Sequence, residues 1–76
     1  MNSMNEDSYK GILIRYREYK LADDRGFMAS FTLVRSVGGR NEEMPYGPTR
    51  SFKTRELARE EAMREAHTLI DQVLSN

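Results

Sequence analysis

The fold is decided by the stretch TRELAREEAMREAHTLIDQVL, residues 54–74, which is long and contains neither Gly nor Pro. Thr54 is suited to cap a helix, because its hydroxyl can accept a hydrogen bond from an amide of the first turn. Glu56 then places a negative charge where the helix dipole favours one. Alanines at positions 58, 62 and 66 begin an apolar stripe that larger residues continue towards the C-terminus. The stretch therefore predicts one long helix with an apolar face.

The length of 76 residues allows a single domain with a small core, because such a chain buries only about 60% of the surface that its unfolded form exposes. There is no Cys, so we expect no disulfide and no thiol chemistry, as suits a reducing compartment. The first residues lack the pattern of a signal peptide, and no apolar run approaches the ~20 residues that span a bilayer. We expect a cytoplasmic protein without membrane contact.

Two strands are predicted from alternating apolar and polar residues. The first is Tyr9–Lys20, with the sequence YKGILIRYREYK, and the second is Phe27–Ser36. Residues 22–26 between them, ADDRG, have the composition of a hairpin turn. In this interpretation Tyr9 falls on the face opposite the core. The side chains expected on the core face are Ile12, Ile14, Tyr16, Phe27, Ala29, Phe31 and Leu33.

The remaining segments complete an α+β architecture. Residues 1–8 are polar and predict a disordered tail, which leaves residues 9–76 as one domain. Residues 37–48 hold three of the five Gly and both Pro, so we expect a long loop there. A short third strand, Thr49–Lys53, is expected to follow and to add Phe52 to the core. The predicted fold is a three-stranded antiparallel sheet with one long C-terminal helix packed on one face.

Side chains that carry catalysis are scarce. The single His, His67, has Asp71 four residues later, and we interpret the two as exposed neighbours on one helix face. Carboxylate pairs at 23–24, 42–43 and 60–61 fall in a turn, a loop and a helix, where each is a solvated cluster rather than a calcium-binding loop. We therefore expect no enzymatic activity, no cofactor and no metal site.

The zero net charge hides an uneven distribution of charge along the chain. Residues 8–55 contain ten basic and five acidic side chains, whereas both flanking segments are negative. The sheet face away from the helix would combine Arg with Tyr, which suits phosphates and stacked bases. An uncovered sheet face needs polar, β-prone residues in any case, and Leu13, Met28 and Val34 would also suit a protein partner. The candidate nucleic-acid-binding residues are Arg15, Arg17, Tyr19 and Arg50.

The far end of the predicted helix is the candidate for self-association. Twenty-one helical residues extend ~31 Å, which is longer than the short third strand, so the last turns are expected to overhang the sheet. Apolar residues on an overhang are often covered by a second subunit, most commonly in a two-fold dimer. The candidate homodimer residues are Leu69, Ile70, Val73 and Leu74.

Both ends of the predicted domain resemble a known family. The start Tyr9-Lys10-Gly11-Ile12 and the junction Phe52-x-Thr54-x-Glu56-x-Ala58 are similar to the three-strand-plus-helix DNA-binding domain of plant ethylene-response factors, with its relatives at the N-termini of tyrosine integrases. In that family Arg residues of the sheet enter the major groove. The resemblance implies this role for Arg15 and Arg17, with Arg50 beside them.

A second resemblance rests on Gly26-Phe27 and on the helix start Thr54-x-Glu56-x-Ala58. Both are similar to the N-terminal domain of HicB-like antitoxins, which also has three strands and a helix. That resemblance implies oligomerisation and the masking of a toxin partner.

We expect a small non-enzymatic binding module that contacts DNA or RNA through the open sheet face. The alternative is a module for protein interaction or homodimerisation.

Overall fold

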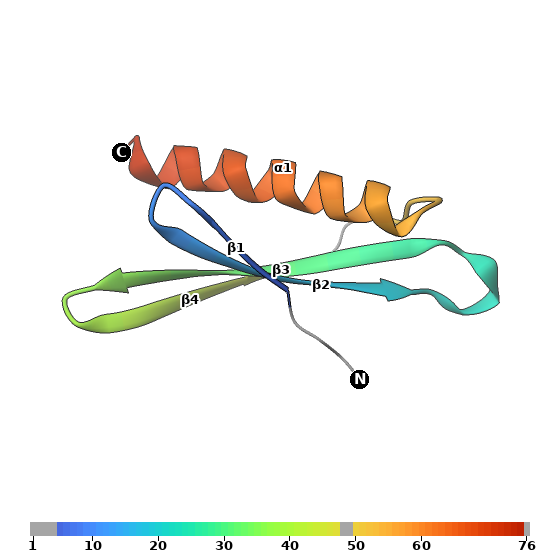
Figure 1. The fold of residues 1–76 in the computed structure, drawn as a ribbon, viewed down its shortest axis with the longest axis horizontal. Coiled ribbons are helices and arrows are strands. Elements are labelled where there is room, and N and C mark those ends of the chain that lie inside the picture. Colours follow the sequence, from blue (N-terminus) through green and yellow to red (C-terminus); the bar gives the residue numbers. More distant parts are fainter. Residues whose placement is uncertain (1–4, 48–49, 76) are drawn as a thin grey trace.

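The computed structural model describes residues 5–47 and 50–75, which form four strands followed by one helix (Figure 1). The strands pair antiparallel in the order in which they occur along the chain, and the helix lies across one face of the sheet. The predicted α+β architecture with a C-terminal helix is therefore confirmed, but the sheet has four strands rather than three. The elements are β1 (Asn5–Tyr9), β2 (Ile12–Lys20), β3 (Phe27–Val37), β4 (Arg40–Tyr46) and α1 (Arg55–Leu74).

Strand β4 occupies most of the segment that was predicted to be a loop. Gly38 and Gly39 have φ angles of 57° and 80°, as a two-residue type I′ hairpin turn requires, and β4 pairs with β3 directly after them. The loop prediction was wrong because it used the Gly and Pro content of the whole segment and missed a hairpin turn. The strand itself, RNEEMPY, has no β-branched residue to mark it.

Strand β1 results from a second two-residue turn, at Lys10 and Gly11, whose φ angles are 52° and 84°. This turn divides the predicted Tyr9–Lys20 strand, and Asn5–Tyr9 folds back along β2. Residues 5–8 of the predicted tail are therefore paired in the sheet, whereas residues 1–4 lie outside the described part. Because Tyr9 pairs with Ile12, its side chain lies on the helix side of the sheet and not on the open face.

The predicted third strand is absent from the described residues, which include 50–53 but not Thr49. Phe52 forms only an isolated bridge to Phe27, with both backbone hydrogen bonds at 2.8 Å. The approach is close enough that a Cβ at Gly26 would collide with the carbonyl oxygen of Phe52. The ring of Phe52 still packs against the core. This segment therefore anchors the start of α1 beside the connection between β2 and β3, which contains a short 3-10 turn at Ala22–Asp24.

The core lies between α1 and the centre of the sheet, and α1 begins where the sequence predicts. The hydroxyl of Thr54 accepts a hydrogen bond of 3.1 Å from the amide of Leu57. The alanine stripe lets the helix approach the sheet closely, so Ile70 is its only large fully buried side chain. The buried cluster consists of Ile12, Ile14, Ala29, Phe31, Leu33, Ala58, Ala62, Ala66 and Ile70.

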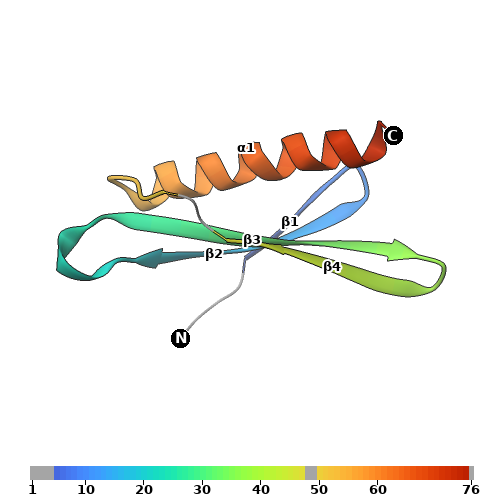
Figure 2. The same cartoon turned by 180° about the vertical axis from the view of Figure 1, so that it is seen from behind.

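One helix does not cover four strands. A helix is about 10 Å across and strands are about 4.8 Å apart, so α1 can cover about two of them, and it packs on β2 and β3. The hairpin of β1 and β2 bends up towards the C-terminal end of α1, whereas the hairpin of β3 and β4 extends past that end (Figures 1 and 2). The sheet therefore projects beyond the helix, and the expected helical overhang is not found.

Candidate functional surfaces

The open face of β2 brings together three of the four predicted nucleic-acid residues. Arg15, Arg17 and Tyr19 alternate along the strand on the side away from α1. The Nε atom of Arg15 lies 3.1 Å from a carboxylate oxygen of Glu6 on β1, and its Nη1 atom lies 3.9 Å from one of Glu43 on β4. Two Arg and two Glu therefore share this face, and its charge is balanced. Sequence reasoning missed both carboxylates because it did not place β1 or β4.

Arg17 and Tyr19 differ from Arg15 in their surroundings. Together with Glu18 and Ser30 they line a shallow pocket with a volume of about 330 Å³. Within residues 5–47 and 50–75, Arg17 makes no ion pair. The pocket thus combines an unpaired guanidinium with a phenol and a hydroxyl, groups that can bind an anion.

Arg50 lies on the other side of the sheet. Its guanidinium is 5.0 Å from the ring centroid of Phe52, and its Nη2 atom is 3.9 Å from a carboxylate oxygen of Glu61 on α1. It lines a pocket between sheet and helix together with Gly47 and Glu65. The structure therefore does not bring Arg50 to the open face with Arg15 and Arg17.

A partly covered apolar surface runs along one side of α1. Glu61 and Glu65 line a pocket with Gly47, which follows β4, so this side of the helix faces β4. Leu69 lies one turn after Glu65 on the same side, and Val73 one turn further. Strand alternation places Met44 and Tyr46 on the helix side, where both pack against the edge of the core. We name this surface the α1–β4 flank; its apolar residues, all half-buried, are Met44, Tyr46, Leu69 and Val73.

The predicted homodimer residues are divided between the core and this flank. Ile70 is fully buried beneath α1, so its side chain is not accessible to a partner. Leu69 and Val73 belong to the α1–β4 flank. Leu74 is 48% exposed at the end of the helix. The dimer prediction therefore rests on Leu69, Val73 and Leu74.

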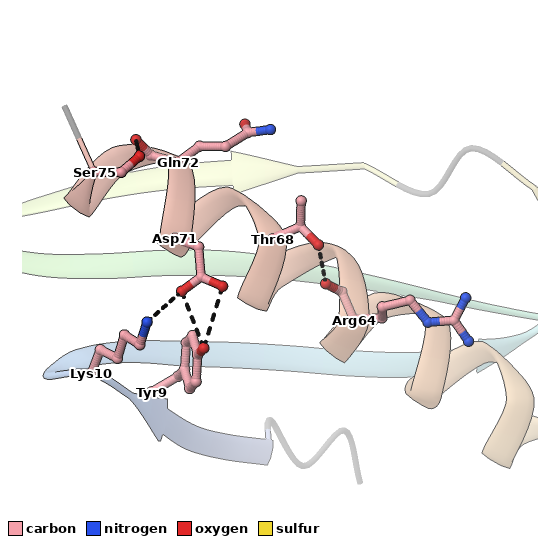
Figure 3. A network of polar contacts seen from close by, with 7 residues as sticks. All are labelled: Tyr9, Lys10, Arg64, Thr68, Asp71, Gln72 and Ser75. Atoms are coloured by element: carbon pink, nitrogen blue, oxygen red, sulfur yellow. Dashed lines mark hydrogen bonds and ion pairs between the residues drawn. The ribbon is translucent and has the colours of Figure 1, made fainter.

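The opposite side of α1 is joined to the turn between β1 and β2 (Figure 3). The Tyr9 ring stacks on His67 with centroids 4.0 Å apart, and its hydroxyl donates to a carboxylate oxygen of Asp71 at 3.1 Å. The Nζ atom of Lys10 lies 2.8 Å from the same carboxylate. The hydrogen bond from Lys10 lowers the pKa of Asp71, and the same bond raises the pKa of Lys10. His67 and Asp71 therefore attach the hairpin of β1 and β2 to the helix.

One further carboxylate, on β2, is largely covered by the fold. Glu18 is the least exposed charged side chain among the ion pairs, and one of its carboxylate oxygens has no hydrogen-bond partner, although the Arg59 Nε atom is 3.9 Å away. Within the described part of the chain, no group of three or more His, Asp or Glu side chains could hold a metal ion. In the same residues, α1 is too polar to cross a bilayer.

Comparisons with protein-family models, curated proteins and solved structures found no match. The resemblances to the ethylene-response-factor domain and to HicB-like antitoxins therefore stay predictions.

Proposed function

We propose that this chain is a non-enzymatic interaction module that forms a two-fold homodimer through the α1–β4 flank. The observation that supports the proposal is the half-covered sheet. Met44 and Tyr46 extend the apolar layer beyond the width of α1, and Leu69 and Val73 face the same uncovered strip. A second helix laid beside α1 would complete that layer.

A second copy of this chain is the occupant that fits the charges of the flank. Strand alternation puts Arg40 on the helix side of β4 beyond Met44, near the C-terminal end of α1. Glu65 lies on the other side of Leu69, towards the N-terminal end. Neither side chain has an ion-pair partner within residues 5–47 and 50–75. A two-fold axis near Leu69 would place the Arg40 of each copy close to the Glu65 of the other.

Helix packing is favoured over pairing of sheet edges. Strand β4 is at the edge of the sheet and contains Pro45, which has no N–H to donate to an added strand. The neighbouring Glu42 and Glu43 would also repel a second β4 brought alongside. The contact between copies should therefore use the face of β4 and the side of α1.

The charge arrangement can be tested by exchange. Arg40→Glu and Glu65→Arg should each weaken the dimer, whereas the double variant should restore it, because the attractive pairs are re-formed with reversed polarity. Each of the two symmetric pairs should contribute up to about 1 kcal/mol, as exposed ion pairs do. The measurement is sedimentation equilibrium over a wide range of protein concentration, with Leu69→Glu as the variant expected to abolish association.

Arg25→Glu is the matched control, because it makes the same charge change on the connection between β2 and β3, away from the flank. It should leave the dimer intact. A wild-type chain that stays monomeric at every concentration would refute the proposal. A dimer that is indifferent to Leu69→Glu and to both reversals would place the interface elsewhere and refute it equally.

A further inference from the structure

The end of the molecule at which α1 begins gathers basic side chains from two distant parts of the chain. The backbone bonds between Phe27 and Phe52 hold the start of the helix against the connection between β2 and β3. The guanidinium of Arg55 lies 5.5 Å from the ring centroid of Phe27. Lys20 pairs with Phe27 in the sheet, so it lies at the same end. We name this end of the molecule the basic end. Its members on the helix side of the sheet and on the adjoining connections are Lys20, Arg25, Lys53 and Arg55, and Arg17 is its member on the open face of β2.

These five side chains are distinguished by their lack of partners. Of the twelve Lys and Arg residues, six form ion pairs within the described part of the chain. The other six are Arg40 and the five members of the basic end. Asp23, Asp24 and Glu56 also lie at this end, so five unpaired positive charges meet three negative ones. The local excess is modest, but none of these five positive charges is neutralised by an ion pair among the described residues.

The groups around this charge suit phosphate in particular. Three of the five are Arg, whose planar fork can bind two oxygens of one phosphate. The shallow pocket of Arg17, Tyr19 and Ser30 adds two hydroxyl groups, which commonly contact phosphate oxygens in nucleic-acid complexes. The ring of Tyr19 could also stack on an unpaired base. The cation at Arg55 is positioned over Phe27 rather than neutralised by a carboxylate.

We infer that the basic end binds the sugar–phosphate backbone of nucleic acid from both faces of the sheet, with Arg55 at the start of α1 on one face and Arg17 in the shallow pocket on the other as its principal contacts. This inference does not depend on the homodimer. It moves the nucleic-acid contact away from Arg15, which is paired with Glu6 and Glu43, and from Arg50, which is beside Glu61. Contact with backbone alone implies little preference for sequence.

Fluorescence anisotropy of labelled duplex DNA, single-stranded DNA and RNA tests the inference with the full chain. On duplex DNA, each phosphate contact should contribute about −0.9 to the slope of log affinity against log salt concentration. The double variant Arg17→Ala with Arg55→Ala should therefore bind several-fold more weakly at low salt and flatten the slope by about 1.8. Anionic phosphatidylserine vesicles form a separate arm, because a lipid surface also attracts basic residues.

Arg15→Ala with Arg64→Ala is the matched control. It removes one Arg from the open face of β2 and one from the surface of α1, as the test variant does, but both of its residues are ion-paired. The control should retain a steeper slope and tighter binding than the test variant. Absence of binding to any nucleic acid at low salt, binding to the vesicles alone, or equal losses in test and control would each overturn the inference.

Discussion

The two sides of α1 face the two edges of the sheet, and the contrast between them shows what a single helix can cover. On the β1 side, Tyr9 and Lys10 reach up to His67 and Asp71, so polar and aromatic contacts close the edge of the core. On the β4 side no hydrogen bond or ion pair joins β4 to α1 within the described residues, and Met44 and Tyr46 are only half-buried. The bent hairpin of β1 and β2 closes one edge of the core, whereas the other edge is only partly covered in the described residues.

The largest loss of stability should come from substitution of Ile70, which is buried beneath α1 between its two sides. Ile70 is fully buried at the middle of the apolar layer, so Ile70→Ala should lower the free energy of unfolding by about 2–5 kcal/mol. Leu69→Ala, one residue away on the α1–β4 flank, should cost clearly less in the monomer because its side chain is only partly buried. Urea unfolding at a concentration that keeps the chain monomeric makes the comparison. Equal losses would mean that the flank is as well packed as the core.

Removal of the stacked ring should open the closed edge. Tyr9→Ala loses the contact with His67 and the hydrogen bond to Asp71, and should destabilise the monomer by roughly 1–2 kcal/mol. Amide hydrogen exchange should then show faster opening of the hairpin of β1 and β2 than of the hairpin of β3 and β4. Tyr9→Phe is the finer variant, since it keeps the ring and deletes only the hydroxyl. If Tyr9→Ala left exchange in that hairpin unchanged, the attachment would have no structural role.

Acid should produce a smaller effect at the contact between Lys10 and Asp71. The pKa of Asp71 is lowered by its hydrogen bond with Lys10, so the contact stabilises the fold above the ordinary carboxyl pKa. That stability is lost as the pH falls through the lowered pKa of the folded state. Thermal melts from neutral to acid pH should therefore show a difference between wild type and Asp71→Asn that disappears at the acid end.

The contact between Lys10 and Asp71 also makes stability depend on alkaline pH, where its contribution is lost as the pH rises. The hydrogen bond with Asp71 raises the pKa of Lys10 above 10.5, so its contribution is present below that value and is lost as the pH rises through the raised pKa. Asp7→Asn, at a carboxylate without an ion pair among the described residues, is the control for both ranges. A difference between wild type and Asp71→Asn that persists unchanged at the acid end would contradict this assignment.

Sequence reasoning succeeded where the signal is local and repeated. Thr54 caps α1 as expected, and the alanine stripe faces the core. It failed where a single dipeptide changes the course of the chain. Lys10-Gly11 and Gly38-Gly39 each make a tight turn, and each creates an edge strand that composition did not reveal.

The two missed strands explain most of the errors in placing the candidate surface residues. Arg15 has the expected place on the open face, but its neutralisation by Glu6 and Glu43 depends on cross-strand register. Tyr9 was assigned to the wrong face because one turn reverses the alternation. Arg50 was assigned to the open face as part of a third strand, which the described residues 50–53 do not form. The register of a hairpin is fixed by the turn that joins its strands, so missing the turns at Lys10-Gly11 and Gly38-Gly39 also lost the cross-strand neighbours of Arg15.

The order of the strands also has a consequence for how the chain reaches its native state. Every strand pairs with its neighbour in sequence, so the sheet can assemble through short loop closures, each of which loses little entropy. The contacts between the segments farthest apart in the sequence form when α1 docks on β2 and β3. The contact between Tyr9 and Asp71, 62 residues apart, forms at the same stage. We expect helix docking to limit the folding rate, and substitutions in the alanine stripe to slow folding more than those in the hairpin turns.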